Sequence, residues 1–239
     1  MKILALETSA KAVSVAVVED GVVLAAAYQN IGLTHSVTLM PLMDNLLHNA
    51  GLTAADMGLI AVAAGPGSFT GLRIGVSAAK GLAWALELPC CGVSALEAMA
   101  ENARMFEGTV ICAMDARRQQ IYNAVFDCRG GVLTRRCEDR AVALETLADE
   151  LKNDTQPKIV VGDGAKLCDA YLSTQGISCR IAPPDSQYQK AVGVALSAER
   201  LAQKGQTVTA QVLRPTYLRL SQAERERLAK GLPITLEDQ

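Results

Sequence analysis

Two acidic residues, Glu7 and Asp115, each end an apolar run and stand 108 residues apart. Carboxylates at two equivalent strand ends can hold a metal–phosphate group when glycines that follow let backbone N–H groups reach the phosphates. No glycine follows here: residues 8–11 are Thr-Ser-Ala-Lys, and residues 116–119 are Ala-Arg-Arg-Gln. A Cβ at these positions obstructs close backbone approach. We interpret both acids as solvated strand ends in a vestigial nucleotide cleft, with Arg117 as a candidate ion-pair partner.

A magnesium–nucleotide site around these two acids stays open as the alternative. It would make the protein an ATP-Mg-dependent small-molecule kinase or ATPase. Gly162-Asp163-Gly164 could then contact an adenosine, although two glycines beside a strand end also form a plain turn.

The glycine-rich run Gly65-Pro66-Gly67-Ser68-Phe69-Thr70-Gly71 precedes a predicted helix, as phosphate loops do. It has neither the lysine of the Walker pattern nor the G-x-G-x-x-G spacing. Close approach of another chain's backbone would explain these glycines as well as a phosphate does.

The histidines and cysteines show no catalytic or metal-binding pattern. His35 and His48 lie thirteen residues apart at the two ends of one predicted helix, and neither is next to a G-x-S-x-G motif. The seven cysteines are irregularly spaced without a C-x-x-C pair, which predicts small buried thiols in a reducing compartment. We therefore predict no catalytic residue, no bound metal and no cofactor held by this chain alone.

The composition excludes disorder and a broadly basic nucleic-acid binder. Half of the 239 residues are hydrophobic, 20% are charged, and 23 basic against 25 acidic residues give a formal charge of −2. No leader sequence or membrane span is apparent, so we expect a soluble cytoplasmic protein with no membrane partner. An RNA-binding module is a further possibility, because basic residues cluster near the C-terminus: Arg214, Arg219, Arg225, Arg227 and Lys230. Interspersed glutamates instead favour a solvated helix.

The order of the predicted elements indicates an internal duplication. Three short strands follow residue 3, and three more follow residue 110, each set ending its first strand at an acid. A helix, a strand and a helix then follow in each half. This order predicts an α/β protein with the duplicated ribonuclease-H-like fold of the actin, hexokinase and Hsp70 class. The two βββαβα lobes would span residues 1–106 and 107–220, followed by a polar tail at 221–239.

Two predicted helices in the first half carry an unusual amount of apolar or small surface. In the helix over residues 34–50, leucines and methionines cover more than about 150° of arc, whereas packing on one core requires about 100°. The helix over residues 69–86 has Gly71, Gly75, Ala79 and Ala83 at a spacing of four. This ridge either packs on the protein's own sheet or lets a partner helix approach closely.

The run from Ala64 to Gly75, AGPGSFTGLRIG, resembles the signature of the TsaB (YeaZ) family. The opening ILALETS at residues 3–9, the start of the helix at His35-Ser36 and the late RPTYLR at residues 214–219 resemble the same family. The resemblance implies an actin-like fold and a role in making N6-threonylcarbamoyladenosine at position 37 of tRNA. It further implies a non-catalytic subunit that forms a heterodimer with TsaD through helices of the N-terminal lobe.

The family resemblance also sets expectations for partners and cofactors. TsaE would join the complex, ATP or ADP and a metal would bind in the partners, tRNA would be contacted mainly through the complex, and the isolated chain could form a homodimer. TsaD's metal-binding H-x-x-x-H is absent, and no nucleophile supports the family's older glycoprotease label. Glu7 departs from the aspartate usual at that position. The residues predicted to form the partner interface are His35, Leu39, Met40, Met43, Leu47, Gly71, Leu72, Gly75 and Ala79.

Overall fold

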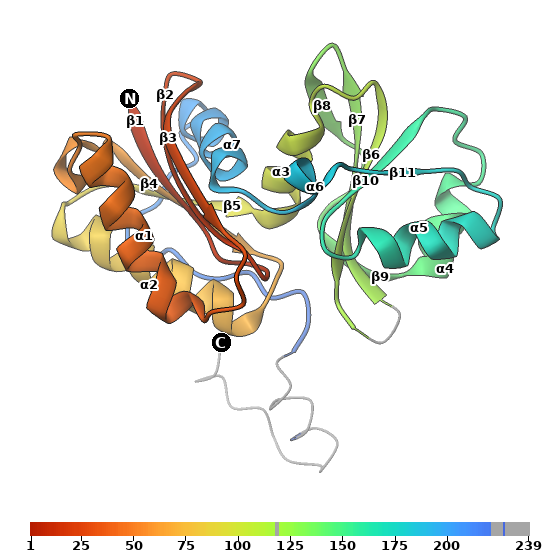
Figure 1. Ribbon diagram of the computed structural model, residues 1–239, viewed down its shortest axis with the longest axis horizontal. Helices are drawn as coiled ribbons and strands as arrows, with labels where there is room; N and C mark the ends of the chain where they lie inside the picture. The colour runs from red at the N-terminus through yellow and green to blue at the C-terminus, as the bar shows by residue number, and fades with distance from the viewer. Residues whose placement is uncertain (118–119, 221–226, 228–239) are drawn as a thin grey trace.

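The computed structural model describes residues 1–117, 120–220 and 227, and it folds into two lobes side by side (Figure 1). None of the helices in these ranges is long and apolar enough to span a membrane.

The first lobe is built on a five-stranded mixed sheet in the order β3-β2-β1-β4-β5. Its strands are β1 (Lys2–Glu7), β2 (Val13–Glu19), β3 (Val22–Gln29), β4 (Leu59–Gly65) and β5 (Cys90–Ser94). The helices α1 (His35–Asn49) and α2 (Phe69–Ala85) cover one face of this sheet, and the 3-10 helix η1 (Ala54–Asp56) lies between α1 and β4. Strands β1 and β4 are buried along nearly their whole length, because helices cover both faces of the sheet.

The second lobe repeats the same sheet order, β11-β10-β6-β7-β8, with β9 paired to β7. Its strands are β6 (Gly108–Asp115), β7 (Gln120–Arg129), β8 (Val132–Arg135), β9 (Arg140–Ala143), β10 (Lys158–Val161) and β11 (Arg180–Ile181). Helices α4 (Leu144–Leu151) and α5 (Ala165–Thr174) occupy the positions that α1 and α2 hold in the first lobe. The predicted duplication is confirmed: β1 and β6 are equivalent central strands, and Glu7 and Asp115 are their last residues.

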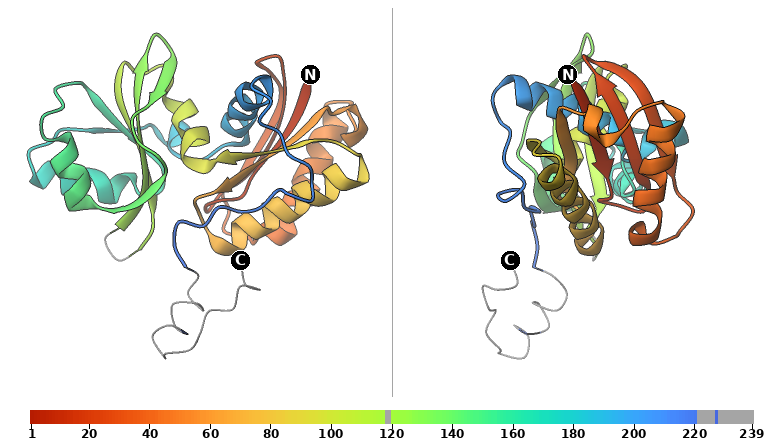
Figure 2. Two further views of the ribbon diagram at one scale, coloured as in Figure 1. Left: turned by 180° about the vertical axis from the view of Figure 1, so that it is seen from behind. Right: turned by 90° about the vertical axis from the view of Figure 1, so that its left-hand side faces the viewer.

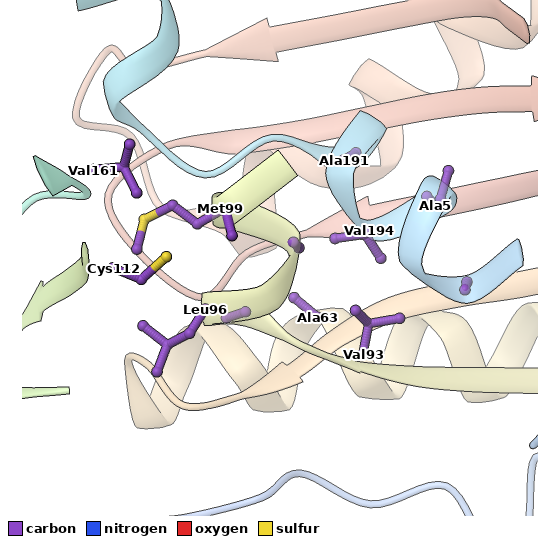
Figure 3. Packing of buried hydrophobic residues seen from close by; sticks show 14 of the residues in the cluster. Ala5, Ala63, Val93, Leu96, Met99, Cys112, Val161, Ala191 and Val194 are labelled. Atoms are coloured by element: carbon purple, nitrogen blue, oxygen red, sulfur yellow. The ribbon is translucent and has the colours of Figure 1, made fainter. Parts of the chain in front are cut away.

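The lobes meet through two helices, each of which packs against strands from the other half of the chain. Helix α3 (Ala95–Ala100), extended by the 3-10 helix η2 (Glu101–Ala103), packs on β6 and β7, and α7 (Ala191–Gln203) packs on β1 and β2. Figure 3 shows Leu96 and Met99 of α3 beside Cys112 and Val161, and Val194 of α7 on the side of Ala5 and Ala63. One core cluster therefore runs continuously through both lobes.

The predicted second lobe of residues 107–220 is wrong at its C-terminal end. After the short α6 (Pro184–Gln187) the chain crosses back, and α7 supplies the second cover for the first lobe's sheet. Cys90 pairs with Val208 in an isolated β-bridge, and Ala210 and Leu213 join the core beneath α1 and α2. The uncovered apolar face of β1 and β2 is the physical reason, since both faces of this sheet need a cover.

Residues 214–220, here called the strap, run beside α2 toward the junction of the lobes (Figure 2). The Thr216 N–H donates to the Ala64 carbonyl at 2.7 Å, and the Arg219 guanidinium donates to the Ala116 carbonyl. The strap thus joins the end of β4 in the first lobe to the end of β6 in the second.

Candidate functional site

The glycines of the β4–α2 connection face a loop of the same chain. A Cβ on Gly67 would lie 2.4 Å from the Ser9 carbonyl oxygen, and one on Gly71 would lie 2.1 Å from the Thr8 carbonyl oxygen. The Ser68 N–H donates to the Ser9 carbonyl at 2.7 Å, so the β1–β2 loop packs directly against the N-terminal end of α2. The glycines therefore accommodate this loop, and neither a phosphate nor another chain is needed to explain them.

Glu7 is fully buried, which contradicts the expectation of a solvated acid paired with Arg117. Its Oε1 accepts a hydrogen bond from the Ser9 N–H at 2.6 Å, while Oε2 has no partner among the described residues. Burial raises the pKa of Glu7 to about 7, against the opposing effect of the Ser9 hydrogen bond. The β1–β2 loop closes over Glu7 because the glycines of α2 let it approach so closely.

Asp115 behaves as expected for an exposed strand-end acid. Its Oδ1 accepts a hydrogen bond from the Arg117 N–H at 2.7 Å, and Arg117 has a φ of +63° in the turn that follows. Asp115 and Asp163 line a cleft of about 680 Å³ between the lobes, together with Ser9, Lys11 and residues of the strap. Burial raises the pKa of Asp163. The structure therefore places Asp115 in the cleft and Glu7 beneath the loop that borders it.

Seven of the nine predicted interface residues are buried within the subunit. These seven residues are Leu39, Met43, Leu47, Gly71, Leu72, Gly75 and Ala79. They were predicted to form the partner interface, but the subunit itself buries them: the apolar arc of α1 packs against β2, β3 and α2, and the small residues of α2 pack against β4 and Thr8.

His35 and Met40 are the two predicted interface residues that are not buried. The ring Nε2 of His35 donates to the Ala10 carbonyl at 2.7 Å, which ties the start of α1 to the β1–β2 loop. Met40 is 44% exposed on the outer side of α1, where Val37 is 64% exposed.

The outer side of α2 carries two features that the sequence analysis did not single out as interface residues. Trp84 is 72% exposed, and Gly81 is an exposed glycine inside the helix. Apart from the backbone of α2 itself, no described residue has an atom within 4 Å of the place that a Cβ on Gly81 would take. Glycine in a helix interior costs about 0.5–1 kcal/mol relative to alanine. Unlike Gly71 and Gly75, Gly81 has no contact with another described residue that explains the choice of glycine. The sequence shows that Gly81 lies inside a helix, which is unfavourable for glycine, but only the structure shows that Gly81 is exposed whereas Gly71 and Gly75 are buried.

The thiols and histidines form no nucleophilic or metal-binding group within the described ranges. All seven cysteines are free, and burial raises the pKa of the Cys112 and Cys168 thiols, the latter to about 12. No three His, Cys, Asp or Glu side chains of the described residues converge in a way that could hold a metal ion.

A family model described as tRNA N6-adenosine threonylcarbamoyltransferase, TsaD, matches residues 29–227. The protein named tRNA threonylcarbamoyladenosine biosynthesis protein TsaB in Bacillus subtilis is 33% identical over 94% of this chain and 96% of its own length. The chain belongs to the TsaB family. The TsaB protein of Escherichia coli is 31% identical over 92% of this chain and 95% of its own length.

Solved structures agree with the assignment to the TsaB family. YeaZ from Pseudomonas aeruginosa superposes with a TM-score of 0.76 at 28% identity, covering 91% of this chain and 99% of that one. A second Pseudomonas aeruginosa structure, of a protein with similarity to the peptidase YeaZ, gives a TM-score of 0.78 at 27% identity with the same coverage. Component A of (R)-2-hydroxyglutaryl-CoA dehydratase from Acidaminococcus fermentans has a TM-score of 0.51 at 15% identity, which shows a shared fold alone. The predicted actin-like fold of this TsaB-family chain is confirmed.

Proposed function

We propose that this chain is a non-catalytic subunit for the synthesis of N6-threonylcarbamoyladenosine in tRNA, and that it works by pairing with TsaD. The observation that carries the proposal is its 33% identity to a TsaB protein over nearly the full length of both chains. TsaE, ATP or ADP and a metal would belong to the partners in the complex. Most of the tRNA contact would be made through the complex.

The outer side of α1 and α2 is the surface we assign to pairing. Val37 and Met40 near the start of α1 and Trp84 near the end of α2 are exposed apolar side chains, and Gly81 leaves the backbone of α2 uncovered among the described residues. Helices can approach each other closely where one of them has a glycine, and exposed aromatic side chains are typical anchors of interfaces. The same surface would support a homodimer when TsaD is absent.

The arrangement around Glu7 supports a role without nucleotide chemistry. In a kinase of this fold class, the loop after the first strand would leave room for phosphates, but here the Ser9 carbonyl bonds to the start of α2. The buried carboxyl of Glu7 has only the Ser9 N–H as hydrogen-bond partner among the described residues. The alternative of an ATP-Mg-dependent enzyme is tested by titrating ATP-Mg into the isolated protein, where micromolar binding would favour it.

A peptidase function finds no support in the described side chains. The His35 ring is bonded to the Ala10 carbonyl, and His48 lies exposed at the far end of α1. Buried thiols with raised pKa values are poor nucleophiles, because the thiolate is the reactive form.

The direct test combines calorimetry with mass spectrometry of modified tRNA. Gly81→Glu places a charged side chain in open space, so the subunit should stay folded while its heat of binding to TsaD is lost. Lys166→Glu, on the exposed side of α5, is the control with a charge introduced elsewhere. Adenosine modification by TsaD and TsaE should require this chain and fail with Gly81→Glu. Unchanged affinity of the Gly81→Glu variant would contradict the assigned surface, and modification that is independent of the chain would contradict the function.

A further inference from the structure

A groove of about 910 Å³ separates α2 from the strap, and its charged lining is entirely basic. Its walls come from residues 73–80 of α2 and residues 213–220. The charged side chains in this lining are Arg73, Lys80, Arg214 and Arg219, and no aspartate or glutamate is among the described residues that line it. In a chain with a formal charge of −2, this is a local concentration of positive charge.

Three of these cations have carbonyl groups or solvent, rather than carboxylates, beside them. The Lys80 ammonium donates to the Leu213 carbonyl at 3.2 Å, the Arg219 guanidinium donates to the Ala116 carbonyl, and Arg214 is exposed. Among the ion pairs between described residues, none involves any of the three. These carbonyl contacts orient the side chains, and no carboxylate among the described residues compensates their positive charge.

The fourth cation is part of an aromatic stack at the end of the groove. The Arg73 guanidinium lies 4.0 Å from the centroid of the Phe69 ring, and its Nε donates to the Tyr217 hydroxyl at 3.1 Å. The Phe69 and Tyr217 rings are themselves stacked, with centroids 4.6 Å apart. This stack fixes the strap against α2 and so holds the two walls of the groove at a set separation.

We propose that this groove binds the phosphate backbone of RNA. Arg73 and Lys80 are seven residues apart, which is about 10 Å along the helix axis. A nucleic-acid strand carries one phosphate per about 3.4 Å of helix axis, so several phosphates would pass these side chains. Arginine forks match phosphate oxygens, and arginine planes also stack on the unpaired bases of RNA.

The choice of tRNA as the natural RNA rests on the proposed function, whereas the anionic character of the ligand rests on the groove alone. The sequence favoured a solvated helix for the C-terminal basic residues, but Arg214 and Arg219 lie on the strap, which is not helical. Arg225 and Lys230 lie outside the described residues. An acidic protein segment is the competing anion, and the experiment includes it as a separate probe.

The test is a fluorescence-anisotropy titration of the full chain with a labelled tRNA transcript at 50 and 200 mM salt. If Lys80, Arg214 and Arg219 each contact one phosphate, the affinity should fall about 40-fold between the two salt concentrations. Arg214→Glu carries the main test, because Arg214 is exposed and makes no hydrogen bond to another described residue. Lys80→Glu/Arg214→Glu should weaken binding at low salt and reduce the salt effect to about 3-fold. Lys166→Glu/Lys204→Glu makes the same change in net charge at exposed positions elsewhere and is the matched control.

Weaker tRNA binding by both groove variants, with unchanged binding by the control, supports the proposal. No binding by the unaltered chain, or an equal loss in the control, overturns it. Sodium polyglutamate is the probe for an acidic partner. If it bound the unaltered chain as tightly as tRNA does, and if the same groove variants lost that binding, the result would overturn the proposal in favour of an acidic partner. Unfolding midpoints measured for every variant exclude loss of fold as the cause. Pairing with TsaD is measured separately without RNA, so a failure here leaves the proposed function standing.

Discussion

The Thr8 hydroxyl donates a hydrogen bond to the Gly71 carbonyl at 2.7 Å, from a strand end 63 residues earlier in the chain. A Cβ added to Gly71 would lie 2.1 Å from the Thr8 carbonyl oxygen, and a Cβ added to Gly75 would lie 2.3 Å from the Thr8 Oγ1. One threonine thus fits between two turns of α2. This contact closes the loop over Glu7 and fixes α2 against β1.

Alanine at the glycines of α2 should have opposite effects, depending on which side of the helix they face. We expect Gly71→Ala and Gly75→Ala each to lower the free energy of unfolding by about 1–3 kcal/mol, because the added methyl group overlaps Thr8. Gly81→Ala should raise it by about 0.5–1 kcal/mol, because the site is open and alanine favours the helix. Urea unfolding curves measure all three, and a destabilised Gly81→Ala would contradict the account of that glycine.

Removal of the Thr8 side chain provides a test of the contact itself. In a Thr8→Ala background the hydroxyl that overlaps a Cβ at Gly75 is gone, so Gly75→Ala should become less destabilising by about 1 kcal/mol or more. The Gly71 site meets the Thr8 carbonyl instead, so Gly71→Ala should stay equally harmful in that background. Equal coupling of both glycines to Thr8 would show that the loop moves as a whole.

Glu7 should make the protein less stable as the pH rises. Its pKa is about 7 in the folded protein, against 4.5 for an exposed glutamate carboxyl. Between these values the folded state holds a proton that the unfolded state has lost, so stability falls with rising pH from about 4.5 to 7 and then levels off. The total loss is on the order of 3 kcal/mol. Denaturant unfolding between pH 5 and 8.5 measures it.

Glu7→Gln is the matched variant for this pH dependence, because it keeps the shape of the protonated acid without its titration. The variant and the unaltered protein should have similar stability near pH 5, and the variant should be the more stable above pH 7. A stability difference that stays constant with pH would mean that Glu7 binds protons equally in the folded and unfolded states, so that folding does not raise its pKa.

The sequence was sufficient to predict the elements whose pattern is local. The helix expected over residues 34–50 forms at His35–Asn49, and the one expected over residues 69–86 forms at Phe69–Ala85. Each has a continuous apolar repeat, which determines its position without reference to the rest of the chain.

The missing elements and the misassigned surface have non-local causes. Helix α5 begins after Gly164 without a side-chain cap, and β11 is only two residues long, so neither has a clear start signal. The side on which α7 packs cannot be predicted from its own sequence, because its partners, β1 and β2, lie almost two hundred residues earlier. The burial of Leu39 and Leu47 was missed for the same reason: the width of an apolar arc does not show how many elements of the same chain will cover it.

Truncation should reveal that α7 belongs to the first lobe. A chain ending at residue 187 keeps both sheets but leaves the apolar face of Ile3, Ala5 and Val18 without its covering helix. We expect it to lose cooperative unfolding and to bind a hydrophobic dye. A chain ending at residue 220 keeps α7 and should unfold cooperatively. If the chain ending at 187 retained a cooperative transition, the first lobe would be stable without α7.

Arg200 of α7 should stabilise the junction of the lobes through a buried acid. The side chain of Glu101 is only 3% exposed and pairs with Arg200, which is itself 41% exposed and also approaches Glu97. Arg200→Met leaves Glu101 with the longer contact to Arg104 at 3.4 Å, and we expect the free energy of unfolding to fall by about 2–3 kcal/mol. Adding Glu101→Gln removes the buried charge, so the double variant should regain part of that loss. Urea unfolding at low and high salt measures both variants, and equal instability of the two would assign the effect of Arg200 to its packing rather than to its charge.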